Sequence, residues 1–303
     1  MPIDAVRTPE ARFENLPDFD YTPKYAEDLP GYEGLRMAYL DEGPSDAEHV
    51  FLCLHGQPSW SFLYRKMIPP FLASGGRVIA PDFFGFGRSD KPTDDDAYGF
   101  SFHRDALLAL IETLSLTRFT LVCQDWGGLI GLTLPVAIPR AVERLIVMNT
   151  ALAVGVDPGP GFKAWKEYVA SQPDFDVGGL MARAIPGLTD EDKKAYEAPF
   201  PSVEFKAGVR TFPALVPVTP EMPGAALSKQ AAAWWSSAWK GQAFMAVGVQ
   251  DPVLGPPVMK SLRRVIQGCP EPLMLEEAGH FVQEAGAHVA EAALAAFAES
   301  PTR

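Results

Sequence analysis

Short runs of apolar residues recur along the chain and are separated by segments long enough to form helices. Several of these runs are apolar at consecutive positions, which is typical of strands covered on both faces. Between them, apolar positions return at helical spacing, for example over residues 102–115, 128–138 and 257–266. Alternating strands and helices predict an α/β fold with a mostly parallel sheet flanked by helices. The predicted strands span residues 35–43, 50–56, 77–85, 119–125, 144–150, 243–251 and 272–280.

The interval 152–222 departs from this pattern. It is rich in Pro and Gly, as in "DPGPG" and "TFPALVPVTPEMPG", and it contains short helical pieces but no convincing strand. Because it lies between two predicted strands, we expect a helical cap domain inserted at the edge of the sheet. The main domain is then built from residues 1–151 and 223–303.

The charge balance narrows the class of partner. Lys and Arg number 26 and Asp and Glu number 38 in 303 residues, so the formal net charge is −12. Nucleic acids and anionic membranes bind basic surfaces, and this composition therefore argues against both. It leaves a small neutral molecule as the natural partner.

Targeting and metal signals are weak in this chain. The first twenty residues hold no apolar segment of the kind found in a secretory leader, and no run approaches the length of a membrane span. The cysteines, which number 3, have neither disulfide-like nor metal-like spacing. We therefore expect a cytoplasmic protein with reduced thiols and no metal site.

The stretch "LVCQDWGGLIG" places an ionisable residue, Asp125, where an apolar strand meets an apolar helix. A carboxylate in such a place is costly unless it is hydrogen-bonded or performs chemistry. Small residues, Cys123 and Gly127, lie two positions to either side, as the sharp strand-to-helix turn of a nucleophile elbow requires. The N–H groups of the following helix would stabilise the charge. We therefore expect Asp125 to be a nucleophile.

An Asp nucleophile suits displacement at an alkyl carbon. Serine would form an ether that water could not readily cleave, whereas a carboxylate forms an ester that an activated water can attack. The second step needs a base, an acid to orient it and an oxyanion hole. His280 and Asp251 follow the last two predicted strands and fit the first two roles, in the chain order of the α/β-hydrolases. The backbone N–H groups of Gln57 and Trp126 are the natural oxyanion donors.

Several motifs together resemble those of the haloalkane dehalogenases, in the branch whose catalytic acid follows the strand before the histidine strand. They are "HGQPSW", "PDFFGFGRSDKP", "CQDWGG", "GFKAWKEYV", "YEAPFP", "FKAGVRTFPALVP", "GVQDPVLGP" and "AGHFVQE", and they extend over nearly the whole chain. The resemblance implies an α/β-hydrolase fold and hydrolysis of a small halogenated alkane to an alcohol and a halide ion. It also implies an alkyl ester on Asp125, water as co-substrate, no cofactor and a monomer.

The same resemblance assigns a halide site and a substrate pocket. Trp126 and Trp165 would donate their indole N–H groups to the departing halide. Indole is a donor without acceptor capacity, which suits an anion that must not be protonated. The implied pocket residues are Phe162, Phe212, Pro213 and Val216. One position departs from the family, because Gln57 stands where this branch has Glu, and this leaves any role of its side chain open.

Other readings of these residues are possible. An epoxide hydrolase shares the Asp and His chemistry but needs acidic hydroxyls, for which Tyr168 and Tyr196 are the candidates in the insertion. A ligand-binding protein on a degenerate hydrolase scaffold is a second alternative, although no catalytic residue is missing here. His55 is a rival base, but a histidine in an H-G-x-P loop more often shapes the turn.

Overall fold

The computed structural model describes residues 3–299 and contains an eight-stranded sheet in the order β10-β9-β8-β7-β4-β5-β3-β2. The strands from β10 through β5 run parallel, and β3 and β2 complete the edge as antiparallel strands. β1 and β6 pair separately. The strands are β1 (Ala5–Val6), β2 (Lys24–Ala26), β3 (Met37–Glu42), β4 (Val50–Leu54), β5 (Arg77–Pro81), β6 (Lys91–Pro92), β7 (Phe119–Cys123), β8 (Val142–Met148), β9 (Gln242–Gly248) and β10 (Leu273–Leu275).

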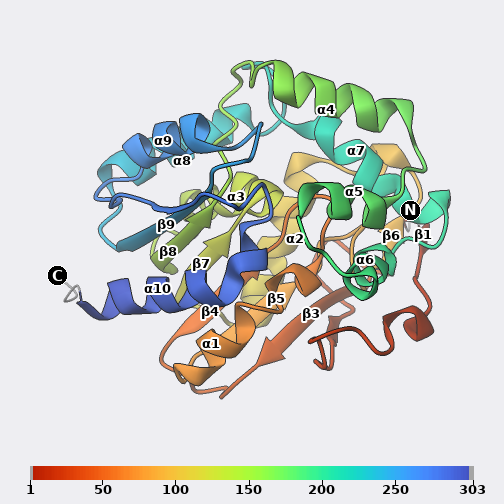
Figure 1. The fold of residues 1–303 in the computed structure, drawn as a ribbon, viewed down its shortest axis with the longest axis horizontal. Coiled ribbons are helices and arrows are strands. Elements are labelled where there is room, and N and C mark those ends of the chain that lie inside the picture. The colour runs from red at the N-terminus through yellow and green to blue at the C-terminus, as the bar shows by residue number, and fades with distance from the viewer. Residues whose placement is uncertain (1–2, 300–303) are drawn as a thin grey trace.

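Helices lie on both sides of this sheet (Figure 1). In the main part of the fold α1 contacts α10, α2 contacts α3, and α8 contacts α9. None of the helices in residues 3–299 is long and apolar enough to cross a membrane. The helices are α1 (Ile68–Ala73), α2 (Phe100–Thr113), α3 (Asp125–Gly131), α4 (Pro160–Ser171), α5 (Val177–Ala184), α6 (Asp190–Glu197), α7 (Ala207–Leu215), α8 (Ala225–Ser237), α9 (Pro256–Val265) and α10 (Gly286–Glu299).

The predicted α/β architecture is confirmed, and each predicted strand is present. The central strands β4 and β7 are buried almost throughout, as their continuous apolar runs indicated. The pattern missed β2, which is only three residues long and carries an exposed lysine at the sheet edge. The helix predicted over 128–138 was misplaced, because α3 begins at Asp125 and ends at Gly131, and a short 3₁₀ turn follows.

The interval 152–222 contains α4 to α7 and no strand. In Figure 1 α4, α5 and α7 gather at one side of the molecule, beside the end of the sheet that leads into α3. This arrangement is what brings the insertion near the strand ends. In parallel sheets the carboxyl ends of the strands are where ligands bind.

Candidate active site

Asp125 sits on a sharp turn between β7 and α3. Its φ is +49°, a left-handed conformation that non-glycine residues rarely adopt. The turn brings α3 so close to β4 that a side chain at Gly127 would collide with the carbonyl oxygen of Leu54. The backbone N–H of Asp125 donates to Asn149 at 3.0 Å, and Thr150 Oγ1 donates to the Asp125 carbonyl at 2.7 Å. The glycine and these two bonds hold the strained residue in place.

The two oxygens of the Asp125 carboxylate have different surroundings. Oδ1 accepts the backbone N–H of Gln57 at 2.7 Å, and the backbone N–H of Trp126 also donates to the carboxylate. Oδ2 lies 3.6 Å from His280 Nε2. Burial raises the pKa of Asp125 above its usual value, against the opposing effects of His280 and the two N–H donors. Oδ1 is thus held by a backbone donor, and Oδ2 is directed toward the histidine.

His280 and Asp251 come from the ends of the last two strands and meet directly. His280 Nδ1 lies 2.8 Å from Asp251 Oδ2. Burial opposes a charge on the ring, but Asp251 and then Asp125 outweigh it and raise the pKa of His280 to about 9. Burial also opposes the charge of Asp251, yet its neighbours, chiefly His280, hold the pKa of that carboxyl well below its usual range. The pair can therefore orient and stabilise an imidazolium.

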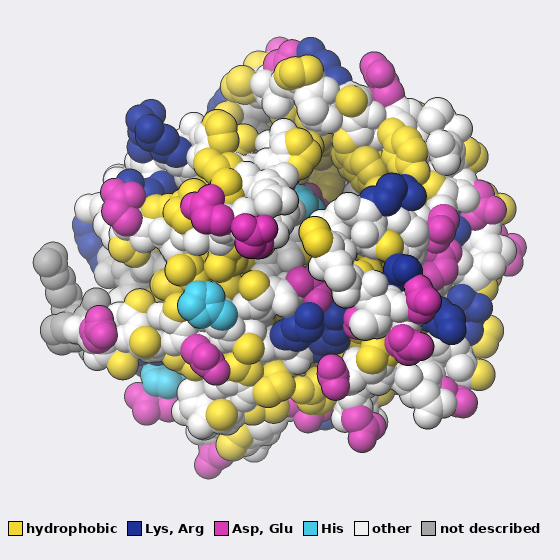
Figure 2. All heavy atoms as spheres, in the orientation of Figure 1, with side chains coloured by type: hydrophobic (Ala, Val, Ile, Leu, Met, Phe, Trp, Pro, Cys, Tyr) yellow, Lys and Arg dark blue, Asp and Glu magenta, His cyan; other side chains and the backbone are white. Residues whose placement is uncertain are grey.

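A cavity of about 710 Å³ opens above these groups. Figure 2 shows this face of the molecule hollowed and lined largely by apolar side chains. Most of the residues predicted from the sequence line it, namely Gln57, Asp125, Trp126, Phe162, Trp165, Pro213, Val216, Asp251 and His280. Phe212 does not belong to that lining. Its ring lies behind Trp126, with centroids 4.4 Å apart, and only 1% of the residue is exposed.

The two predicted halide donors, Trp126 and Trp165, both line the cavity. Two other buried indoles have protein acceptors, because Trp60 Nε1 donates to the Ala195 carbonyl and Trp235 Nε1 donates to the Leu132 carbonyl, whereas Trp239 Nε1 is buried without a partner among the described residues. Among residues 3–299 no acceptor is found for the indole N–H of Trp126 or Trp165, although both side chains line the cavity. An anion in the cavity would satisfy these donors.

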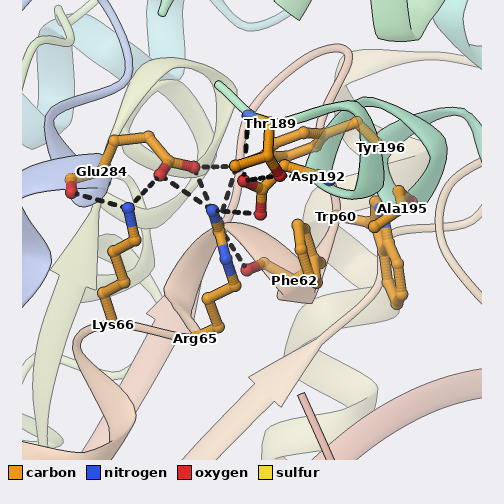
Figure 3. Close-up of polar contacts among 9 residues, drawn as sticks. All are labelled: Trp60, Phe62, Arg65, Lys66, Thr189, Asp192, Ala195, Tyr196 and Glu284. Carbon is orange, nitrogen blue, oxygen red and sulfur yellow. Dashed lines mark hydrogen bonds and ion pairs between the residues drawn. The ribbon is translucent and has the colours of Figure 1, made fainter. Parts of the chain in front are cut away.

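The alternative acids and base lie elsewhere. Tyr196 is fully buried and donates its hydroxyl to Glu284, while Arg65 donates to Tyr196 at 3.2 Å (Figure 3). Tyr168 accepts from Arg183 at 3.2 Å. His55 is also fully buried, and its Nε2 accepts the backbone N–H of Phe83 at 3.0 Å. None of these three side chains is among the residues lining the cavity of the described chain.

Two functional neighbours were missed from the sequence. Asn149 is fully buried, and its Nδ2 donates to Asp251 Oδ2 at 2.9 Å and to the Gly248 carbonyl at 3.0 Å. The rule that polar residues at the carboxyl ends of strands serve the site could have identified it, because it follows β8. Gln124 contacts His280, with the two Nε2 atoms 2.8 Å apart. No pattern in the sequence indicates that contact.

Known proteins resemble this chain over nearly its full length. A family model described as the α/β hydrolase fold matches residues 49–287. A haloalkane dehalogenase of Psychrobacter cryohalolentis is 43% identical over 286 residues, which cover 92% of this chain and 93% of the relative. Haloalkane dehalogenase 1 of Mycobacterium tuberculosis is 39% identical, with 95% and 97% covered.

A solved structure matches this chain at higher sequence identity. The haloalkane dehalogenase DpaA of Paraglaciecola agarilytica, described as tetrameric, superposes with a TM-score of 0.96 at 50% identity. The match covers 98% of this chain and 100% of that one. Identity at this level over full lengths, together with the fold, assigns both the family and its hydrolytic reaction. The chain belongs to the haloalkane dehalogenases, enzymes of the α/β-hydrolase fold that hydrolyse carbon–halogen bonds.

Proposed function

We propose that this enzyme converts a haloalkane to an alcohol in two steps through an alkyl ester on Asp125. In the first step Oδ2 attacks the carbon that bears the halogen. A carbon–oxygen bond forms as the carbon–halogen bond breaks, and the halide leaves with the electron pair. The indole N–H groups of Trp126 and Trp165 donate to the leaving halide, which needs charge stabilisation and no proton.

The second step hydrolyses the ester. His280 Nε2 takes a proton from a water molecule, whose oxygen attacks the carboxyl carbon of Asp125. Oδ1 then bears the negative charge and accepts the N–H groups of Gln57 and Trp126 as its oxyanion hole. When the tetrahedral intermediate collapses, the bond from that carbon to the alkyl oxygen breaks, and the proton passes from His280 to the alkoxide. Asp251 holds the imidazolium meanwhile.

The change of charge at Asp125 during the cycle determines when His280 can act as a base. In the free enzyme burial opposes a charge on His280, but Asp251 and Asp125 outweigh it and raise the pKa of His280 to about 9, which favours the imidazolium. Ester formation removes the charge of Asp125, and the pKa of His280 falls as a result. The ring therefore becomes able to act as a base at the stage that needs one.

One observation carries this proposal. The Asp125 carboxylate lies at the base of an apolar cavity, where Oδ1 accepts the backbone N–H of Gln57, the backbone N–H of Trp126 also donates to the carboxylate, and Oδ2 lies 3.6 Å from His280. A nucleophile held this way leaves Oδ2 for displacement and keeps Oδ1 for the later oxyanion. The Asp251–His280 pair completes the machinery for hydrolysis.

The test compares two substrate classes. We expect the purified protein to release halide from 1,2-dibromoethane and 1-bromobutane without added metal or organic cofactor. Diol formation from styrene oxide should stay at background, because Tyr168 and Tyr196 are engaged outside the cavity. Asp125→Ala is the control and should abolish halide release. Turnover retained in that variant would refute the proposal.

We further propose that residues 152–222 act as a cap over a main domain of residues 1–151 and 223–303. Two cap side chains, Phe162 and Trp165, line the cavity and so help to exclude water from it. One chain supplies the nucleophile, the base, the acid and both indoles, so we propose that the monomer is the catalytic unit. Sedimentation across dilutions, with activity measured at each, tests this against a tetramer like that described for DpaA.

We also propose that the enzyme works in the cytoplasm. Cys53, Cys123 and Cys269 are all free and buried. Free thiols are typical of proteins in a reducing compartment. Fractionation of the producing cells, with halide release as the readout, tests this location.

A further inference from the structure

We infer that Gln124, the residue immediately before the nucleophile, holds His280 in the neutral form that can take a proton from water. The inference rests on the proposed role of His280 as the base. Gln124 follows β7, and its side chain is fully buried. Its Nε2 lies 2.8 Å from His280 Nε2 and donates to the His280 carbonyl oxygen at 3.1 Å. It is a positioning residue, because it acts through His280.

The His280 carbonyl fixes which way the amide points. A carbonyl oxygen can only accept, so the group that faces it must be the NH₂ of Gln124 and not its oxygen. The same NH₂ then faces His280 Nε2, which must accept and therefore carries no proton. The ring proton is left on Nδ1, 2.8 Å from Asp251 Oδ2. Gln124 and Asp251 thus select the same tautomer from the two ring nitrogens.

The charged groups around His280 act in the opposite sense. Asp251 faces the ring from the segment after β9, and Asp125 faces it from the start of α3. Both favour the imidazolium, which cannot serve as a base. Glu284, on the same segment as His280, is held instead by Arg65 and Lys66 at 2.8 Å each. Esterification removes the charge of Asp125 and so lowers the pKa of His280. The Gln124 amide donor lowers that pKa as well.

The amide has a structural cost that packing alone does not explain. Among the described residues, Gln124 Oε1 is buried without a hydrogen-bond partner. An unsatisfied buried acceptor is destabilising, and an apolar side chain of similar length would avoid it. Since the other half of the amide contacts the base, its benefit lies in the histidine and not in the fold.

An NMR titration tests the inference without turnover. Asp125→Asn neutralises the nucleophile, as esterification does, and serves as the background. We expect the pKa of His280 to rise by about one unit when Gln124→Met is added, because a donor to the neutral ring is lost. The His280 signal is assigned by its disappearance in His280→Phe. An unchanged or lower pKa in the Gln124→Met variant would overturn the inference.

A second variant and a matched control sharpen the result. Gln124→Glu should raise the pKa of His280 further than Gln124→Met. When ionised it attracts the imidazolium, and when protonated it can donate to the His280 carbonyl while accepting from the ring. Gln283→Met removes an equally buried amide three residues after His280 and should leave that pKa unchanged. An equal shift in the control, or the reverse order of the two Gln124 variants, would contradict the assignment.

Kinetics with Asp125 intact link the effect to catalysis. In Gln124→Met the acid limb of ester hydrolysis should move about one pH unit upward, while the alkylation rate changes by less than about twofold. An acid limb that stays in place would refute the role in catalysis. Failure of the proposed function would show differently, as absence of halide release in the parent, and would leave the NMR titration interpretable.

Discussion

The two walls of the cavity are held in different ways. On the sheet side Asp125, His280 and Asp251 each make short hydrogen bonds to buried groups at the strand ends. On the insertion side α4 presents Phe162 and Trp165, which contact the rest of the protein through apolar packing. The polar contacts of α4 involve exposed pairs such as Lys163 with Asp157, and exposed pairs contribute little to stability.

A third region, α6, belongs to the insertion but is held by ion pairs, unlike α4. Arg65 from the main fold pairs with Asp192 of α6 at 2.9 Å, and with Glu284 after His280 at 2.8 Å. Tyr196 donates to the same Glu284 (Figure 3). The insertion is therefore anchored by buried charges at α6, while α4, which carries the proposed halide donor Trp165, is not. We conclude that chemistry is positioned by polar networks and that the substrate is enclosed by packing.

The largest effect is expected for Asp251→Asn, on the sheet side of the cavity. Asp251→Asn keeps the shape of the acid but removes the charge that stabilises the imidazolium and that selects the tautomer of the neutral ring. Ester hydrolysis should slow by about 10²–10⁴-fold, whereas alkylation by Asp125 should change far less. Single-turnover kinetics with a bromoalkane separate the two rates. Equal losses in both steps would mean that Asp251 acts on the whole site and not through His280.

Substitution of Trp126 and of Trp165 compares the sheet side of the cavity with its insertion side. Trp126→Phe and Trp165→Phe each remove one N–H donor, and a lost charge-assisted bond should weaken bromide binding and slow carbon–halogen cleavage by about tenfold or more. Trp126, which is 3% exposed and packs on Phe212, should also lose thermal stability on substitution. Trp165→Phe should leave Tm nearly unchanged. If Trp165→Phe binds bromide as tightly as the parent, the second donor lies elsewhere.

Tyr196→Phe tests how much the buried contacts at α6 contribute to the stability of the protein. The hydroxyl is buried between Glu284 and Arg65, so its loss removes one buried hydrogen bond from each of these charged groups. We expect the free energy of unfolding to fall by about 1–3 kcal/mol with little change in halide release. Chemical denaturation gives the first quantity. Tyr168→Phe, at a partly exposed site, is the matched control and should have little effect on stability.

Among the substitutions in the cavity wall, Gln57→Glu should have the smallest effect on turnover. The backbone N–H of Gln57 donates to Asp125 Oδ1, and this contact survives the change. The side chain donates to the Val209 carbonyl at 3.0 Å, a bond that an ionised carboxylate cannot make. We expect kcat to change by less than about tenfold, or about 1.4 kcal/mol of barrier. A gain of about a hundredfold in ester hydrolysis would show that a carboxylate belongs in the mechanism.

Much of this architecture could be predicted because it follows from local rules. Buried parallel strands show as continuous apolar runs, and the elbow shows as small residues on either side of Asp125. Asp251 and His280 could be proposed because both follow predicted strands. Their pairing in space could be expected from the parallel sheet, in which neighbouring strand ends converge.

What escaped prediction depends on contacts between distant segments. Nothing local to Gln124 indicates that its amide meets His280, which lies 156 positions away in the chain. Phe212 was expected in the pocket wall, but the register of α7 places its ring behind Trp126. Tyr196 was a candidate acid until its hydroxyl was found on Glu284. In each case the side chain's direction was set by tertiary packing.

The central claim is that Asp125 carries the alkyl group between the two steps. His280→Phe removes the base but leaves the nucleophile and the halide donors, so exposure to a bromoalkane should release about one halide per protein. Intact-mass spectrometry should then show one added alkyl group, and peptide mapping should locate it on Asp125. Halide release in a stoichiometric burst with an unmodified Asp125 would contradict the account, because another group would have accepted the alkyl chain.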